Sequence, residues 1–139
     1  MEAMRLKPVT PVLFMQAAED VVIQDLAIPK DTTVMMQNKV GQTDETHFTN
    51  ADQFIPERWI MNGCPHHTAH SPQMIRAFGA GPRFCPGRNL AIQEMKMAIS
   101  MICKNFDLEL AVKPEDVKEV FTFTMFPDGL VVKLEEAYN

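Results

Sequence analysis

The sequence lacks long apolar segments and has few cysteines. None of its apolar runs approaches the roughly 20 residues of a membrane-spanning helix, and the first residues lack the charged-then-apolar order of a signal peptide. The three cysteines, Cys64, Cys85 and Cys103, form no C-x-x-C pair, which argues against a disulfide framework and for a reducing compartment. We therefore expect a soluble, cytoplasmic chain in which a functional thiol is an open alternative.

The chain has no excess of positive charge either. Its formal net charge of −5 argues against nucleic acid as a partner, because such binding depends on neutralising phosphates with Lys and Arg. The charge is uneven, since the stretch from Ser71 to Lys104 has five cationic side chains, one carboxylate and a net charge of +4. A basic face is one interpretation of this stretch, and an ordinary solvated surface is the other.

The first half of the 139 residues predicts a short helix, a small sheet and a long loop. Residues 1–7 favour a helix, which the prolines that follow bring to an end. The β-branched runs at residues 21–23 and 32–34 flank a turn at residues 28–31 and predict two paired strands. Residues 38–77 are polar and lack sustained periodicity, so we expect a long loop with one helical turn.

The second half predicts a buried helix followed by strands. From Gly87 or Arg88 to about Asn105, apolar residues recur at the i, i+3 and i+4 spacing of a helix. Further apolar residues beside that stripe, with Cys103 among them, predict burial on most sides. Residues 107–112, 120–125 and 130–134 are typical of strands, and the last is expected to follow a turn at residues 127–129. The whole chain, residues 1–139, is treated as one α+β domain.

The most informative segment is the ten-residue stretch from Phe78 to Gly87, which ends where the helix is expected to begin. Its three glycines permit close approach of the backbone to a flat ligand, and its two prolines restrict the loop. Cys85 lies just before the helix N-terminus, where unpaired N–H groups and the helix dipole stabilise a thiolate. Arg83 is permanently charged and suited to bind a carboxylate. The alternative is a buried cysteine with a purely structural role.

This segment resembles the haem-binding signature of the cytochrome P450 family, F-x-x-G-x-R-x-C-x-G. All five fixed positions match, at Phe78, Gly81, Arg83, Cys85 and Gly87. The resemblance implies haem b as cofactor, with Cys85 as the proximal iron ligand, Arg83 paired with a haem propionate and Phe78 packed beneath the porphyrin. The expected haem-binding residues are Phe78, Gly79, Gly81, Arg83, Cys85, Pro86 and Gly87.

Two further segments are similar to motifs of the same family. Glu2 and Arg5 match E-x-x-R, and residues 54–59 resemble the P-E-R-F/W segment through Arg58 and Trp59. The resemblance implies a buried triad of Glu2, Arg5 and Arg58 that holds the loop under the haem. For Glu2 and Arg5 alone, a surface ion pair would be the ordinary interpretation.

The implied architecture is the C-terminal part of the mainly helical cytochrome P450 fold, with a small antiparallel sheet, the cysteine loop and a following buried helix. The sequence departs from the family at two places. Phe14-Met15-Gln16 stands where a second propionate-binding Arg or His is common, and Asp31 stands where glycine is usual. The family's oxygen-activating helix and most substrate-recognition segments lie upstream of Met1, so no residue here is assigned a catalytic role.

The resemblance implies a haem-thiolate monooxygenase that inserts one oxygen atom from O2 into a small organic substrate. Peroxygenases and isomerases share the same ligand, and a truncated noncatalytic haem-binding or interaction fragment is the alternative from another class. The electron donor would be an acidic ferredoxin or flavin reductase, steered by Arg76, Arg88, Lys96 and Lys104. A membrane anchor, N-terminal in this family, stays an open alternative for localisation.

A second metal-capable cluster lies outside the signature. Cys64, His66, His67 and His70 fall within seven residues, which makes a zinc site conceivable. No partner cluster with suitable spacing is visible elsewhere in the sequence, so a polar loop is the preferred interpretation.

Overall fold

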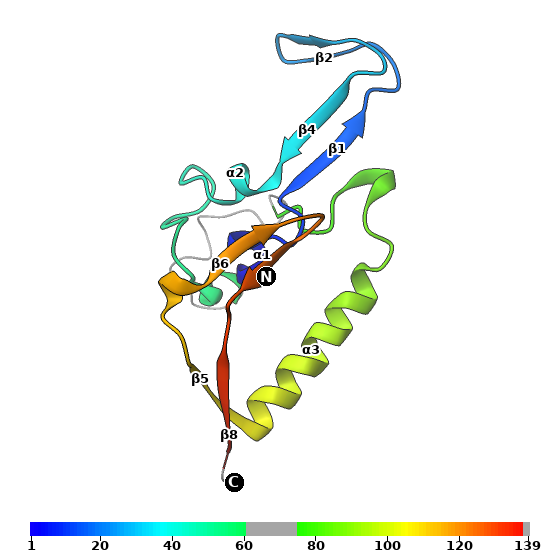
Figure 1. Ribbon diagram of the computed structural model, residues 1–139. Helices are drawn as coiled ribbons and strands as arrows, with labels where there is room; N and C mark the ends of the chain where they lie inside the picture. Colours follow the sequence, from blue (N-terminus) through cyan, green and yellow to red (C-terminus); the bar gives the residue numbers. More distant parts are fainter. Residues whose placement is uncertain (61–74, 138–139) are drawn as a thin grey trace. The chain divides into compact units, whose positions relative to one another are not determined.

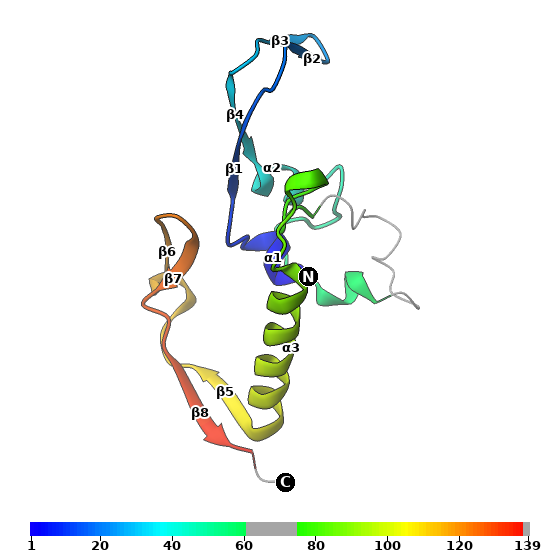
Figure 2. The ribbon, with the colours of Figure 1, turned by 90° about the vertical axis from the view of Figure 1, so that its right-hand side faces the viewer.

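A computed structural model describes residues 1–60 and 75–137 of the chain. The chain divides into two compact units, Met1–Ala77 and Phe78–Asn139 (Figures 1 and 2), and each is described by itself. Helices and small antiparallel sheets occur in the chain, which confirms the α+β class. Within the described residues, no helix combines the length and the apolar character needed to cross a membrane.

The first unit begins with the expected short helix and continues into two pairs of antiparallel strands. Helix α1 spans Glu2–Leu6. Strand β1 (Val12–Gln16) pairs antiparallel with β4 (Thr33–Gln37), and β2 (Val21–Ile23) pairs antiparallel with β3 (Leu26–Ile28). In Figure 1 the β2–β3 hairpin lies at the far end of the ladder formed by β1 and β4.

The predicted pairing of residues 21–23 with residues 32–34 is wrong, although both segments are in or overlap strands. Val21–Ile23 turns back at once onto β3, because Gln24 adopts a left-handed conformation (φ 53°) that closes a two-residue turn. Asp31 is also left-handed (φ 66°), at the position where the family usually has glycine. Aspartate is one of the few other residues that tolerate this region. Asp31 is therefore compatible with the turn between β3 and β4, although the family usually has glycine at this position.

The described part of the long polar segment, residues 38–60 and 75–77, contains two short helices. Helix α2 spans Asn38–Gln42 and the 3₁₀ helix η1 spans Pro56–Trp59, where the sequence predicted a single helical turn. The interior of this unit is largely polar. Among its described residues, the largest fully buried side chains are those of Arg5, Arg58, Phe48, Gln42 and Glu2, each no more than 2% exposed.

The described part of the second unit contains the cysteine loop, one long helix and two pairs of antiparallel strands. The 3₁₀ helix η4 spans Gly81–Arg83, and α3 spans Arg88–Asn105, as predicted. Strand β5 (Phe106–Leu110) pairs antiparallel with β8 (Val132–Glu136), and β6 (Lys118–Phe121) pairs antiparallel with β7 (Met125–Asp128). The 3₁₀ helix η5 spans Pro114–Asp116, between β5 and β6.

Two sequence expectations for this unit are corrected. Residues 120–125 do not form one strand, because the chain reverses at residues 122–124, where the N–H of Thr122 donates to the carbonyl of Thr124 (3.2 Å). Threonine and phenylalanine favour strands, so the composition concealed this turn. The predicted turn at residues 127–129 begins later, since Pro127 and Asp128 belong to β7 and Gly129 (φ 76°) ends it.

Helix α3 is not buried, contrary to the prediction. None of its residues is buried; Leu90 is 65% exposed, Met97 63% and Ile99 61%. Cys103, expected in the core, is exposed as well. Within the second unit, α3 packs mainly against β5, the strand that directly follows its last turn.

Candidate haem-binding site

The cysteine loop is shaped by two left-handed glycines and closed by a backbone hydrogen bond. Gly79 (φ 73°) and Gly81 (φ 65°) adopt a conformation that favours glycine. The N–H of Cys85 donates to the carbonyl of Phe78 at 2.8 Å, and the N–H of Arg88 donates to the carbonyl of Cys85 at 3.3 Å. These bonds fix Cys85 just before the first residue of α3, as the sequence predicted.

The thiol of Cys85 is available to a ligand. Cys85 is exposed, and a Cβ added to Gly87 would lie 3.8 Å from its Sγ atom. A hydrogen at residue 87 therefore leaves space beside the sulfur for a flat group. Pro86, between the two residues, limits the freedom of this short link.

Cys85 as a single protein ligand is compatible with a metal ion that is bound within a macrocycle. Within residues 1–60 and 75–137, no group of three or more His, Cys, Asp or Glu side chains could hold a metal ion. A metal bound by Cys85 would therefore take its other ligands from outside these side chains. Haem iron would meet this condition, because its porphyrin would supply most of the ligands and Cys85 alone would be needed from the protein.

Arg83 of the loop and Arg88 at the start of α3 differ in their surroundings. Arg83 is exposed and has no hydrogen-bond or ion-pair partner among the described residues, so its guanidinium is free to bind a carboxylate. Arg88 instead places its guanidinium carbon 6.0 Å from the ring centroid of Phe78. This contact brings the first residue of α3 onto the first residue of the loop. This contact was not predicted from the sequence, because the two residues are separated by the nine residues 79–87, which have no regular periodicity.

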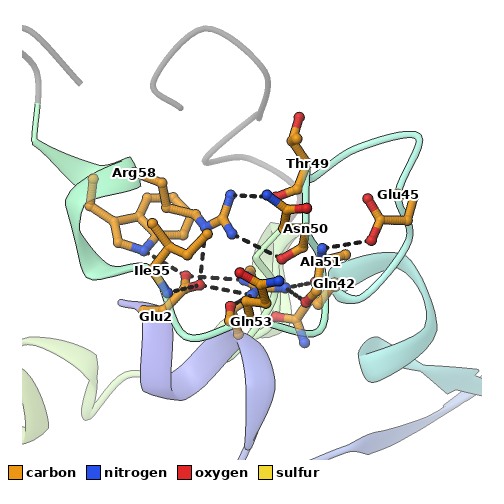
Figure 3. Close-up of polar contacts among 11 residues, drawn as sticks. Glu2, Gln42, Glu45, Thr49, Asn50, Ala51, Gln53, Ile55 and Arg58 are labelled. Atoms are coloured by element: carbon orange, nitrogen blue, oxygen red, sulfur yellow. Dashed lines mark hydrogen bonds and ion pairs between the residues drawn. The ribbon is translucent and has the colours of Figure 1, made fainter. Parts of the chain in front are cut away.

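The Glu2–Arg5–Arg58 triad predicted from the motifs is confirmed in the first unit (Figure 3). The carboxylate of Glu2 accepts from Arg5 Nη2 at 2.7 Å and from Arg58 Nε at 3.0 Å through Oε1. Its Oε2 accepts from Arg5 Nε at 3.0 Å. The backbone N–H of Ile55 and the indole N–H of Trp59 add two donors, at 3.2 Å and 2.8 Å.

These contacts change the acidity of Glu2. Its burial raises the pKa, but hydrogen bonds from Arg5, Ile55, Trp59 and Arg58 outweigh this effect and lower the pKa from 4.5 to about 2. The carboxylate is therefore ionised at any pH near neutrality. Two buried guanidinium groups share one carboxylate, so the remaining positive charge needs other acceptors.

Backbone carbonyls of the following loop supply those acceptors. The Arg5 Nη1 group donates to two of them, at 2.7 Å and 2.6 Å, and its Nη2 donates to a third at 3.0 Å. Arg58 donates to two more, at 3.1 Å and 3.3 Å. The five carbonyls belong to Gln42, Ala51, Gln53, Thr49 and Asn50 (Figure 3). Arg5 thus uses all five of its N–H donors, and the two arginines hold the loop by its backbone.

Side chains within the same loop support its shape, with one exception. Asp44 accepts from the N–H and the hydroxyl of Thr46 (2.8 Å and 2.6 Å), and these bonds hold its pKa below the usual value. Glu45 accepts from the N–H of Ala51 at 2.9 Å. The side-chain amide of Gln42 is buried, and neither its nitrogen nor its oxygen has a partner among the described residues.

Comparison with known proteins decides the family. The sequence matches the cytochrome P450 family over residues 1–134. The chain belongs to that family. Cytochrome P450 proteins bind haem b, and haem b is the cofactor that the cysteine loop fits.

Named cytochrome P450 relatives match most of this chain but extend well beyond it. The cytochrome P450 monooxygenase hepD of Aspergillus oryzae is 35% identical over 127 residues, 90% of this chain and 25% of the relative. The steroid 17-alpha-hydroxylase/17,20 lyase of Rattus norvegicus is 32% identical over 139 residues, 95% of this chain and 27% of the relative. The chain thus spans about a quarter of the length of these curated relatives.

Solved cytochrome P450 structures confirm the fold. The cytochrome P450DA heme domain matches with a TM-score of 0.84 and 27% identity, over 99% of this chain and 30% of that chain. The retinoic acid-bound cyanobacterial CYP120A1 matches with a TM-score of 0.84 and 28% identity, over 98% of this chain and 31% of that chain.

The predicted residues of this cytochrome P450 chain fall into two groups. Phe78, Gly79, Gly81, Arg83, Cys85, Pro86 and Gly87 lie on one loop of the second unit. The triad lies in the first unit, together with carbonyl acceptors that have no sequence signature. The zinc alternative at residues 64–70 lies outside the described residues.

Proposed function

We propose that this chain is the haem-binding part of a monooxygenase that inserts one oxygen atom from O2 into a small organic substrate. The observation that carries the proposal is the exposed Cys85 thiol, on a glycine loop closed by the Phe78–Cys85 hydrogen bond before α3. The two curated relatives described above carry the printed names of a monooxygenase and of a hydroxylase/lyase, which supports this reaction class.

Each of the seven expected haem-binding residues has a proposed role. Cys85 binds the iron as a thiolate, Arg83 pairs with a propionate, and Phe78 packs against the macrocycle. Gly79, Gly81 and Gly87 keep the backbone close to it, and Pro86 stiffens the link. Haem held by a thiolate supplies the chemistry of O–O bond cleavage. The residues described here bind and orient that group, and none of them is assigned to proton transfer.

The experiment is to supply haem to the 139-residue chain, reduce it, add carbon monoxide and record the absorption spectrum. Cys85→Ala removes the proposed ligand, and Cys103→Ala is the matched control because that thiol is also free and exposed. We expect a red-shifted Soret band that disappears in Cys85→Ala and persists in Cys103→Ala. Equal binding of haem by Cys85→Ala would refute the assignment of the ligand.

A noncatalytic haem-binding or interaction fragment is the second candidate. It is favoured for the chain by itself by the exposure of α3, where Leu90, Met97 and Ile99 are each more than 60% exposed. The two candidates differ in the oxidation of a substrate. Turnover of any small organic compound by the haem-loaded chain with O2 and a reductant would exclude the noncatalytic reading.

We further propose an acidic electron donor, a ferredoxin or a flavin reductase, that docks on the cationic residues of α3. Arg88, Lys96 and Lys104 are exposed. At about 100° per residue, Lys96 and Lys104 lie roughly 80° and 160° around the helix from Arg88. Glu94, the helix's acidic residue, lies roughly 240° around and so on the other half. A negatively charged partner would therefore meet one cationic side.

Lys96→Glu tests this surface, because Lys96 has no partner among the described residues and its replacement leaves the loop contacts intact. We expect slower reduction of the haem-loaded chain by an acidic donor and a weaker dependence of the rate on salt. Lys118→Glu, on β6, is the control. A rate that depends neither on ionic strength nor on Lys96→Glu would contradict the proposal.

A further inference from the structure

The Glu2 carboxylate receives donors from a fourth side chain that the three-residue motif does not include. Oε1 accepts from Arg5, Arg58 and the backbone of Ile55, whereas Oε2 accepts only from Arg5 Nε (3.0 Å) and Trp59 Nε1 (2.8 Å) among the described residues. The indole is therefore one of two donors that hold this oxygen. Without it, one lone pair of a buried anion would be left unpaired.

The Trp59 ring is positioned for this bond by its surroundings. Its centroid lies 6.3 Å from that of Phe48, with the planes tilted by 56°. Phe48 is fully buried, and its ring lies 5.0 Å from the guanidinium carbon of Arg5. Trp59 thus contacts Phe48 through ring packing and the Glu2 carboxylate through a hydrogen bond.

One short turn supplies most of the donors to Glu2. The backbone N–H of Ile55, the Nε of Arg58 and the indole of Trp59 all come from η1 and the residue before it. The two consecutive side chains reach different oxygens of the same carboxylate. This geometry fixes both the position of the turn and the rotation of the carboxylate.

We propose that Trp59 is a positioning residue of the Glu2 cluster, and that its indole N–H fixes the carboxylate for Arg5 and Arg58. Phenylalanine, the other residue common at this place in the motif, would keep the ring and lack the donor. The cluster of this chain is therefore a tetrad. The inference rests on the first unit alone and does not depend on haem binding.

The test separates the N–H group from the shape of the ring. Trp59 is replaced by phenylalanine and, in a second variant, by benzothienylalanine, which has the shape of tryptophan with sulfur in place of N–H. The Glu2 carboxyl is followed by carbon-13 NMR as the pH is lowered. We expect both variants to raise the pKa of Glu2 above its value of about 2 by roughly one unit.

Trp59 also reports on its own contact, since it is the single tryptophan of the chain. We expect its fluorescence to follow the titration of Glu2, and to lose this transition in Glu2→Gln but not in Glu57→Gln, an exposed acid on the same turn. Should the phenylalanine variant fail to fold, the isosteric variant decides. An unchanged pKa of Glu2 in folded benzothienylalanine protein would overturn the proposal, because packing alone would then explain Trp59.

Discussion

The charge of Glu2 is predicted to be a main source of stability in the first unit. Replacing Glu2 by glutamine keeps the size of the side chain but removes the negative charge between Arg5 and Arg58. Both arginines are fully buried, so they would keep their positive charges without a counter-charge. Removing one partner of a buried ion pair is strongly destabilising, because it leaves the other charge buried and uncompensated.

The pKa of Glu2 gives the magnitude. Folding lowers it from 4.5 to about 2. This difference corresponds to about 3 kcal/mol of stability, at roughly 1.4 kcal/mol per pKa unit. Because the pKa is lower in the folded chain, the stabilisation is complete above pH 4.5 and is lost as the pH falls towards 2. Glu2→Gln should therefore lower the free energy of unfolding by about 3 kcal/mol at pH 7.

Urea unfolding followed by circular dichroism measures this effect without relying on Trp59, which contacts the altered group. The measurement is repeated between pH 7 and the lowest pH at which the chain stays folded. Glu57→Gln, exposed on the same turn, should change the free energy of unfolding by less than about 0.5 kcal/mol. The reasoning is refuted if Glu2→Gln is as mild as the control, or if it keeps the acid dependence of the parent chain.

Three further predictions concern stability, each measured by urea unfolding at pH 7. Gln42→Met should be neutral or stabilising, because the buried amide has no partner among the described residues; a loss above about 1 kcal/mol would indicate a partner. Gly81→Ala should destabilise by about 1 kcal/mol through its φ of 65°, whereas Gly87→Ala, with φ −80°, should not; equal effects would contradict the role of backbone conformation. Lys133→Ala should change stability by less than about 0.5 kcal/mol, since its pairs with Glu109 and Glu135 are more than half exposed; a larger loss would show that these pairs matter.

Motifs with fixed spacing gave the most reliable sequence predictions. The triad was predicted from E-x-x-R and P-E-R-W, and the structure joins its members by hydrogen bonds of 2.7–3.0 Å. The helix was predicted to run from Gly87 or Arg88 to about Asn105, and it spans Arg88–Asn105. In both cases the signal is local, because it depends on residues a few positions apart or on one uninterrupted period.

Long-range partners could not be predicted in the same way. The β1 strand and the turn at Gln24 decide which strands pair, yet neither carries a strong local signal. The prediction that α3 is buried was wrong for a related reason. Apolar residues on several sides of a helix indicate that it can be buried, but exposure depends on which other segments pack against it, and these lie outside the helix sequence.

The carbonyl acceptors of the two arginines illustrate the same limit and explain how a polar loop can be ordered. Composition predicted a loop over residues 38–77, and little apolar surface is buried in its described part, where Phe48 and Ala51 are the buried apolar residues. Its backbone is held instead by guanidinium groups, which stay protonated near neutral pH and present several donors in a fixed plane. Lysine offers three donors from a single atom and could not reach the same carbonyls. The arginines of the two motifs thus fix the conformation of a backbone segment whose own side chains do not indicate that it makes these contacts.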